Sequence, residues 1–320
     1  MSYKTELKSN NTDLQNILDM ILALGLVDAP AVPEADTLNG CSWKNISKIA
    51  AQGDAANYWS VGDCKKITLN GTVGTLALSN YETYVYIIGF DHNGASNTID
   101  FGTFKTSVSG GTDVCLIDKG YDIGSSTNGT LYFNINHWGN YNYGGWAGCD
   151  MRYDILGSTD VAPSGYGSAI TASRVGYNAS ATCATNPVSG TLMSVLPSEL
   201  RAVMKPIEIY TDNVAGSAGH VESSVSVSID YLPLLSEYEI FGVTSISNRY
   251  EASHQTQYEY FANGNAKSKN SHNNIASTAY WSCRSPRPTH TSGFCGIRPN
   301  GVIDNIGANY ANGLSPIFRI

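Results

Sequence analysis

Apolar residues near the N-terminus recur at the spacing of an amphipathic helix. Between Leu14 and Leu24 they return every three or four positions, which would place them on one helical face. The run Thr12-Asp13-Leu14-Gln15 has the form of a capping box, and Gly25 can end the helix. We therefore predict an N-terminal helix within residues 1–28. Its apolar stripe could dock on the following domain, or it could join copies of the chain or a partner protein as a short coiled coil.

A linker is predicted over residues 29–40, where Pro30 and Pro33 stop the helix, and a globular part from Cys41 onward. The pattern there changes to short elements. Strands are expected at 66–69, ahead of an Asn70-Gly71 turn, and at 83–90 and 224–235, with helices at 46–52 and from 197. The last segment, 280–320, reads as strand, long loop, strand. Strands and helices do not alternate in βαβ order along the chain. We therefore predict a loop-rich α+β fold with short mixed or antiparallel sheets.

The composition supports a strand-containing fold with a neutral polar surface. Only 14% of residues are charged, against about 25% in average domains. Asn, Ser, Thr, Gly and Tyr take their place, including 20 Tyr and 32 Gly. Tyr and Thr favour strands, whereas Gly and Asn favour turns. This balance is typical of phage fibres, adhesins and lectins and is uncommon among intracellular metabolic enzymes.

The charge and the apolar runs of the sequence argue against nucleic acids and membranes as partners. The net charge is −8 and the sequence has no basic stripe, so nucleic-acid binding is not expected. The longest apolar run, 17–27, contains Asp19 and Gly25 and is too short to span a bilayer, so we expect no membrane insertion. Residues 1–11 lack the basic region of a secretory signal. We therefore expect assembly in the cytoplasm rather than export by the general pathway.

Catalytic and metal-binding motifs find little support. The seven cysteines are widely spaced, with no Cys-x-x-C motif, and are interpreted as free, mostly buried residues. Asp91-His92-Asn93 is interpreted as a turn, because no second ligand stands at metal-binding spacing. We expect no catalytic residue, no metal and no cofactor.

Several motifs in fixed order resemble a domain common in prophage and gut-bacterial surface proteins. The match covers most of residues 41–320 and ends in a tryptophan, an Arg-Ser-Pro and the segment from Gly313 to Phe318. The pieces are Trp43 to Ile46, Tyr58-Trp59-Ser60-Val61-Gly62-Asp63, Ile88-Gly89-Phe90-Asp91-His92-Asn93, Gly144-Gly145-Trp146, Asp150-Met151-Arg152, Leu196-Pro197, Leu234-Leu235-Ser236, Glu239-Ile240-Phe241-Gly242, Trp281, Arg284-Ser285-Pro286, Gly301 and Gly313-Leu314-Ser315-Pro316-Ile317-Phe318.

This pattern is similar to the C-type-lectin-like fold of the formylglycine-generating-enzyme type. The resemblance implies that fold for residues 41–320. Phage receptor-binding proteins use it, as do targets of diversity-generating retroelements, in which Asn codons change to Tyr, Ser, His and related residues. Residues 263–312 have that alphabet. The enzyme relatives bind copper with a close cysteine pair, but Cys283 and Cys295 are further apart, so that activity is not carried over. Asp304 is the only carboxylate of the final segment, which argues against a calcium–sugar site.

The candidate binding surface is the C-terminal region, about 263–312. Tyr, Ser, Gly and Asn combine rigid aromatic area with adaptable hydrogen bonding, as in antibody loops. The alternative is plain surface turns. The candidate contact residues are Tyr280, Ser282, His290, Ser292, Phe294, Arg298, Asn300, Asn305, Asn309, Tyr310 and Asn312, with Tyr141 and Tyr143 from a second loop. The expected scaffold residues are Trp146, Trp281, Arg284, Pro316 and Phe318. For Arg284 a buried ion pair is favoured over a ligand contact.

These observations predict a phage or prophage tail-associated receptor-binding protein, located in the virion tail and assembled in the bacterial cytoplasm. Its expected partners are a host cell-surface receptor, protein or glycan, and other virion proteins through the N-terminal helix. A homo-oligomer is expected, with a trimer favoured. The alternatives are a virion structural or decoration protein without receptor contact, a bacterial surface adhesin, and an enzyme acting on surface glycans or protein side chains.

Overall fold

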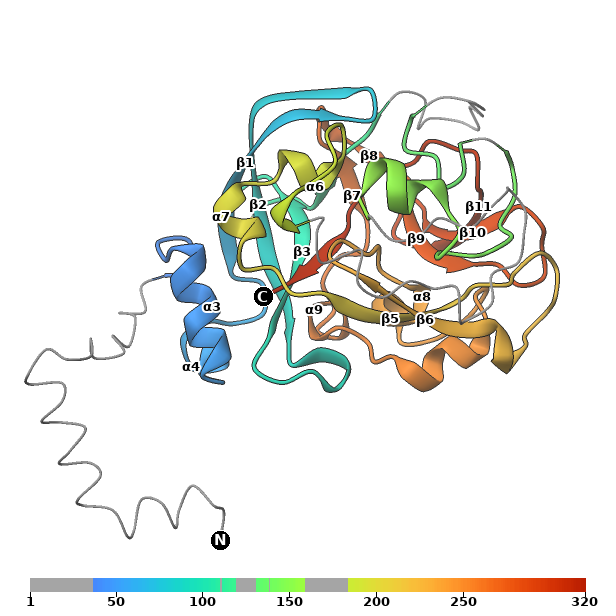
Figure 1. The fold of residues 1–320 in the computed structure, drawn as a ribbon, viewed down its shortest axis with the longest axis horizontal. Helices are drawn as coiled ribbons and strands as arrows, with labels where there is room; N and C mark the ends of the chain where they lie inside the picture. The colour runs from blue at the N-terminus through green and yellow to red at the C-terminus, as the bar shows by residue number, and fades with distance from the viewer. Residues whose placement is uncertain (1–36, 110, 119–130, 138, 159–183) are drawn as a thin grey trace, which may run out of the picture. The chain divides into compact units, whose positions relative to one another are not determined.

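A four-stranded antiparallel sheet joins the two ends of the described chain (Figure 1). The computed structural model describes residues 37–109, 111–118, 131–137, 139–158 and 184–320. The sheet has the order β1 (Cys64–Val73), β2 (Leu76–Phe90), β3 (Ile99–Lys105) and β12 (Ile317–Arg319). The last strand therefore completes a sheet whose other three strands come from the first third of the chain.

The β1–β2 hairpin corrects the predicted turn at Asn70-Gly71. β1 continues through that dipeptide to Val73, and only a register shift between Leu69 and Gly71 marks it. Val73 is fully buried, and it pairs with Leu76 across the actual turn at Gly74. Burial of Val73 and the extra ladder bonds outweigh the local turn preference, and the dipeptide is absorbed as a bulge.

Two helices precede this sheet, α3 (Trp43–Ala51) and α4 (Ala55–Tyr58). The predicted helix at 46–52 is present as α3 but starts earlier, because the Ser42 hydroxyl accepts a hydrogen bond from the Asn45 amide and caps the N-terminus. Trp43 is buried and packs edge-on against Phe101 and Phe318, with ring centroids 5.7 Å and 6.1 Å away. This contact joins the helix to both β3 and β12.

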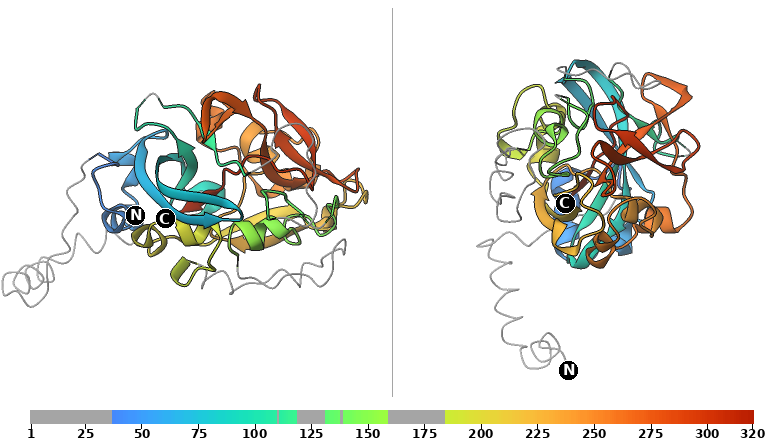
Figure 2. Two further views of the ribbon diagram at one scale, coloured as in Figure 1. Left: turned by 90° about the horizontal axis from the view of Figure 1, so that it is seen from above. Right: turned by 90° about the vertical axis from the view of Figure 1, so that its right-hand side faces the viewer.

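The C-terminal half carries three smaller sheets, and the predicted long loop in 280–320 is wrong. That segment holds an antiparallel sheet of β9 (Trp281–Pro286), β10 (Gly293–Ile297) and β11 (Ile303–Gly307). The other sheets are β4 (Val114–Cys115) with β7 (Lys269–Ser271) and β8 (Asn274–Ala279), and the pair β5 (Ile207–Asp212) with β6 (Val225–Asp230). Figures 1 and 2 show β10 and β11 at the end of the molecule away from α3 and α4.

Short helical segments connect these sheets. β6 ends at Asp230, five residues before the predicted strand end, since Pro233 cannot donate to a ladder. The predicted helix after Pro197 is α7 (Ser198–Arg201). The remaining segments are η1 (His92–Gly94), η2 (Met151–Ile155), α6 (Leu192–Val195), η4 (Glu222–Ser224), α8 (Glu237–Phe241), η5 (Arg249–His254) and α9 (Glu259–Ala262).

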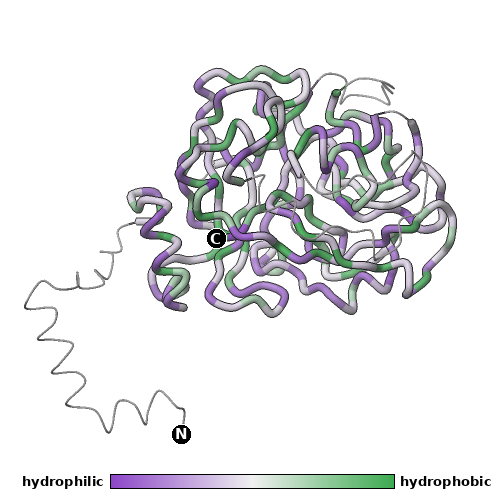
Figure 3. Tube along the Cα trace, in the orientation of Figure 1, coloured by the Kyte–Doolittle hydropathy of each residue, from purple (hydrophilic) through white to green (hydrophobic). Residues whose placement is uncertain are grey.

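The described part is thus a mixed α/β fold of curled, mostly antiparallel sheets with few helices, which confirms the α+β prediction at that level. Residues 35–320 form one compact unit, and Leu38 is buried, so packing begins before Cys41. The predicted N-terminal helix (1–28) and residues 29–36 of the linker lie outside the described residues. Hydrophobic and hydrophilic residues alternate along the trace in short stretches (Figure 3), and no helix of the described part is long and apolar enough to cross a membrane.

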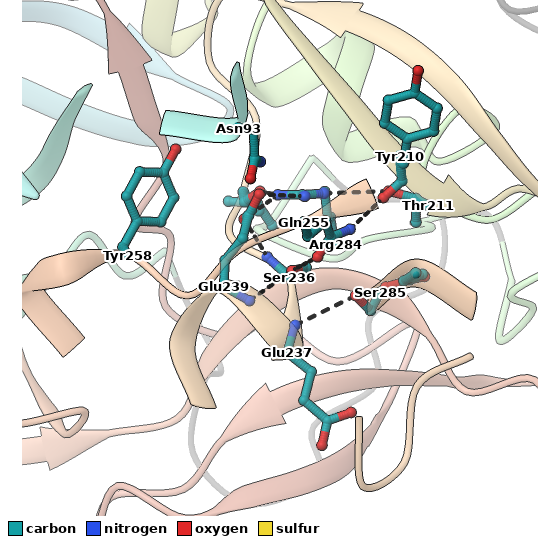
Figure 4. A network of polar contacts seen from close by, with 12 residues as sticks. Asn93, Tyr210, Thr211, Ser236, Glu237, Glu239, Gln255, Tyr258, Arg284 and Ser285 are labelled. Atoms are coloured by element: carbon teal, nitrogen blue, oxygen red, sulfur yellow. Dashed lines mark hydrogen bonds and ion pairs between the residues drawn. The ribbon is translucent and has the colours of Figure 1, made fainter. Parts of the chain in front are cut away.

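A buried polar network lies between α8 and β9 (Figure 4). The Arg284 guanidinium donates to both carboxylate oxygens of Glu239, at 2.6 and 2.7 Å, and to the Thr211 hydroxyl. Burial by itself would raise the pKa of Glu239, but Arg284 outweighs that effect and holds the pKa below its ordinary value. Arg284 is fully buried, which agrees with the buried-pair interpretation and places it beneath the surface.

Candidate recognition surface

Asn142 joins two loops that are far apart in the sequence. Its side-chain amide donates to the carbonyl oxygens of Arg287, His290 and Gly293, at 3.0, 2.7 and 2.8 Å. Its backbone amide donates to the carbonyl oxygen of Thr291 at 2.9 Å. Asn142 is 1% exposed, so these bonds form in a protected interior where they are hard to exchange for water. The loop around Tyr141 is thereby held against the β9–β10 loop.

The two tyrosines that flank Asn142 are presented at this junction. Tyr141 is 49% exposed and Tyr143 is partly exposed, with ring centroids 6.2 Å apart. Tyr143 packs over Gly216, where an added Cβ would lie 2.1 Å from the ring. The Gly216 amide in turn donates to the Asn142 side-chain oxygen at 3.0 Å. The tyrosine pair is therefore supported from below by backbone.

The β10–β11 hairpin closes the other side of this surface. The Ala308 amide donates to the Ser292 carbonyl oxygen at 2.8 Å, and the Asn136 amide donates to the Ala308 carbonyl oxygen at 2.9 Å. Gly307 lies against the Asn140 side chain and the Tyr310 ring. We call the resulting group the aromatic patch; its members, all exposed or partly exposed, are Tyr141, Tyr143, His290, Ser292 and Tyr310.

Three other predicted contact residues lie at the opposite end of the same strands. Tyr280 directly precedes β9, and Arg298 directly follows β10, where Ile297 pairs with Trp281. Arg298 and Asn300 are exposed at the β10–β11 turn, and the Arg298 guanidinium donates to Asp304 at 2.8 Å. The candidate residues thus divide into the aromatic patch and a separate group at this turn.

Four of the five remaining predicted contact residues are buried. Ser282, Phe294, Asn309 and Asn312 are 0%, 1%, 6% and 3% exposed. Asn305 is partly exposed, and its side-chain oxygen lies against Gly293. These side chains can support the loops, but the four buried ones can reach a ligand only if the backbone moves.

The expected scaffold residues are buried. Trp146 is fully buried and donates from its indole nitrogen to Asp230 at 2.9 Å, while Asp230 also accepts from Arg152 at 2.8 Å. The Trp281 indole donates to the Lys267 carbonyl oxygen at 2.9 Å. Pro316 and Phe318 are buried, and the Phe318 ring stacks on Phe101 with centroids 5.0 Å apart.

Cys283 and Cys295 lie on the neighbouring strands β9 and β10, although twelve positions separate them in sequence. Both are fully buried, and burial together with the Glu237 carboxylate raises their thiol pKa values well above the ordinary range. A buried, protonated thiol is a poor nucleophile and a poor metal ligand. The six cysteines that the structure describes are buried and form no disulfide, in agreement with the prediction for them; Cys183 lies outside the described residues.

Sequence reasoning missed the residues that assemble the patch. Asn142 stands in the run Asn140-Tyr141-Asn142-Tyr143, where nothing distinguishes a buried Asn from an exposed one. Gly216 is one of many glycines, although its φ of +66° is one that favours glycine. The turn interpretation of Asp91-His92-Asn93 agrees with the left-handed backbone of Asp91 and Asn93.

Comparison with known proteins gives the family and nothing further. Residues 128–320 match a family described as a domain of unknown function, DUF6273, and this match covers more than half of the chain. The chain therefore belongs to the DUF6273 family. No curated protein and no solved structure matches it.

Proposed function

We propose that this protein is a phage or prophage tail-associated receptor-binding protein, and that the aromatic patch contacts a host-surface receptor. The observation that carries the proposal is the Asn142 junction, because it brings Tyr141 and Tyr143 beside His290 on one surface. The ordered motifs from Trp43 to Phe318 support a C-type-lectin-like scaffold for this surface. In this proposal the N-terminal amphipathic segment attaches the protein to other virion proteins and favours a trimer.

The chemistry of the patch suits recognition. Tyrosine offers a large contact area and a hydroxyl with few rotatable bonds, so ordering it on binding costs little entropy. His290 and Ser292 add donors and acceptors that can pair with a peptide or a sugar. In the core, the Arg284–Glu239 pair and the Trp146–Asp230–Arg152 contacts hold the scaffold fixed. A rigid base with adaptable side chains above it is the arrangement that binding loops use.

Retroelement diversification would act on this same surface. His290, Ser292 and Tyr310 lie within 263–312 and belong to the alphabet that adenine-directed mutagenesis of Asn codons produces. We expect a near-copy of the last gene segment beside a reverse transcriptase gene, differing only at adenines. A genome that encodes this chain without such a copy would remove diversification from the proposal and leave receptor binding to be decided by mutation.

The decisive experiment changes the patch and leaves the scaffold alone. A triple variant, Tyr141→Ser, Tyr143→Ser and Tyr310→Ser, is compared with Tyr58→Ser on α4. Tyr58 is 46% exposed, and α4 lies at the end of the molecule away from β10 and β11 (Figure 1). Binding of the labelled full-length protein to a host strain that the parent protein recognises is the measurement.

We expect the triple variant to bind at least about tenfold more weakly, since central aromatic residues carry much of an interface's free energy. Tyr58→Ser should bind like the parent protein. Unchanged binding by the triple variant, with its thermal transition intact, would remove the aromatic patch as the receptor site.

A further inference from the structure

His137, Asp150 and Asp154 come together from the two sides of the segment that carries Tyr141 and Tyr143. The Nδ1 atom of His137 lies 3.4 Å from the Asp150 Oδ2 atom and 3.7 Å from the Asp154 Oδ2 atom. One ligand atom from each of the three residues lies within 4.8 Å of the others. The His137 side chain is 5% exposed, Asp150 16% and Asp154 44%, so the group opens to solvent on the Asp154 side.

Backbone hydrogen bonds hold these three residues in place. Asp150 directly precedes η2, a π-helical turn that contains Asp154, and residues four apart project from the same side of a helical turn. The Met151 amide at the start of η2 donates to the Ile135 carbonyl oxygen at 3.0 Å, which ties this turn to the segment that carries His137. Arg152, which lies between the two aspartates in the sequence, donates to Asp230 at 2.8 Å.

The spacing fits a shared cation better than a direct hydrogen bond. Hydrogen bonds between nitrogen and oxygen span about 2.7–3.2 Å. Two ligand atoms on a tetrahedral Zn²⁺, each about 2.0–2.2 Å from the metal, lie roughly 3.4 Å apart. The two distances from His137 Nδ1 are close to that separation. All three ligand atoms lie within 4.8 Å of one another, so one ion would have to draw the two carboxylates together.

The chemistry of the three ligand atoms suits a divalent transition-metal ion. The group offers one histidine nitrogen and two carboxylate oxygens. Both kinds of atom are ligands that Zn²⁺ takes in proteins.

We propose that His137, Asp150 and Asp154 form a binding site for one divalent transition-metal ion, with Zn²⁺ as the best fit. The imidazole ligand favours Zn²⁺ and related ions over Ca²⁺ and Mg²⁺, which prefer all-oxygen sites. A fourth position remains for water or another donor on the exposed Asp154 side. The ion would fix the segment around residue 137 to η2 and so stabilise the base of the aromatic patch. This site stands whether or not the patch binds a receptor.

The test is calorimetric titration of the full chain, freed of metal with a chelator, with ZnCl₂. Asp154→Asn removes one anionic ligand at the most exposed of the three positions, where the substitution is the least harmful to folding. His290→Asn is the matched control, because His290 is an exposed histidine of the nearby patch and not part of the metal group.

We expect one Zn²⁺ per chain in the parent protein and in His290→Asn. Asp154→Asn should bind at least about tenfold more weakly, since even indirect partners of metal ligands contribute that much. Zn²⁺ should raise the thermal midpoint of the parent protein and leave that of Asp154→Asn nearly unchanged. The metal-free midpoints of the two should agree, which separates loss of the ligand from loss of the fold.

Three results would overturn the proposal. The parent protein could bind no Zn²⁺, Asp154→Asn could bind it as tightly as the parent does, or His290→Asn could abolish binding. A fourth measurement decides the class of ion: CaCl₂ at the same concentration should not displace Zn²⁺, and equal competition by Ca²⁺ would make the transition-metal assignment wrong.

Discussion

At the scale of single residues, this protein stabilises buried charge in two different ways. Arg284 and Glu239 remain ionised together because each satisfies the other in a bidentate contact. Glu251 is also fully buried, and among the described residues it accepts hydrogen bonds from the Ser285 hydroxyl and the Asp212 amide. Burial therefore raises its pKa to about 8, and these two hydrogen bonds only partly counteract the shift. Folding should therefore change the protonation state of Glu251.

Folding stability should consequently fall as the pH rises toward 8. A carboxyl group with a raised pKa in the folded state contributes stability that is fully present below its ordinary pKa of 4.5 and is lost as the pH passes through about 8. Glu251→Gln keeps the shape and stays neutral, so its free energy of unfolding should vary less between pH 5 and pH 8. Between pH 5 and pH 8, the fall in the free energy of unfolding should be smaller in Glu251→Gln than in the parent protein by a few kcal/mol, because each pKa unit corresponds to about 1.4 kcal/mol.

Urea unfolding at a series of pH values measures this effect. Glu259→Gln, at an exposed position in the first turn of α9, serves as the control and should keep the slope of the parent protein. A parent-like slope in Glu251→Gln would show that another group dominates the pH dependence.

At the scale of elements, the predictions succeeded where hydrophobic periodicity is strong and failed where Gly and Asn build strands. The strand expected at 83–90 lies within β2, where Val85 and Ile87 are buried in the sheet. β10 contains two glycines, and β11 contains Asn305 and Gly307, which local preference assigns to loops. Gly296 is needed there because a Cβ would meet the Ile306 side chain at 2.6 Å. That requirement comes from tertiary packing and cannot be seen in the sequence.

The junction of loop and hairpin should depend on Asn142. Asn142→Ala would leave the carbonyl oxygens of Arg287, His290 and Gly293 without this donor in a buried setting. The expected loss is about 1–3 kcal/mol in the free energy of unfolding. Amide hydrogen exchange in residues 287–293 should become faster, while exchange in β1 and β2 should change only through global stability.

Asn57→Ala on α4 is the matched control, since Asn57 is exposed and its side-chain amide donates to the nearby Asp54. If exchange in residues 287–293 stayed at the parent rate in Asn142→Ala, the two loops would be joined by other contacts than those of Asn142.

At the scale of the whole molecule, residues from the two ends of the described part of the chain form one core. The sequence identified Trp43 and Phe318 as members of one ordered pattern, but it could not show that they touch. That contact depends on β12 pairing with β3, a pairing between segments some two hundred positions apart. The aromatic patch was equally hidden: its residue types were recognisable, but its assembly depends on Asn142 and Gly216. Long-range pairing decides both, and local patterns do not encode it.

The closure by β12 predicts that damage at the C-terminus should unfold the whole described unit. Phe318 is fully buried between Phe101 and Trp43, and its Arg319 neighbour donates to Asp100 at 2.6 and 2.7 Å. Phe318→Ala should cost about 3–5 kcal/mol through lost burial and a residual cavity. Because β12 connects the N-terminal sheet to the rest of the core, tryptophan fluorescence and far-ultraviolet circular dichroism should report one common, lowered transition.

Val302→Ala, at a 51% exposed position of the β10–β11 turn, should leave the midpoint unchanged. Two separate transitions in Phe318→Ala would instead mean that the C-terminal sheets fold independently of β1, β2 and β3.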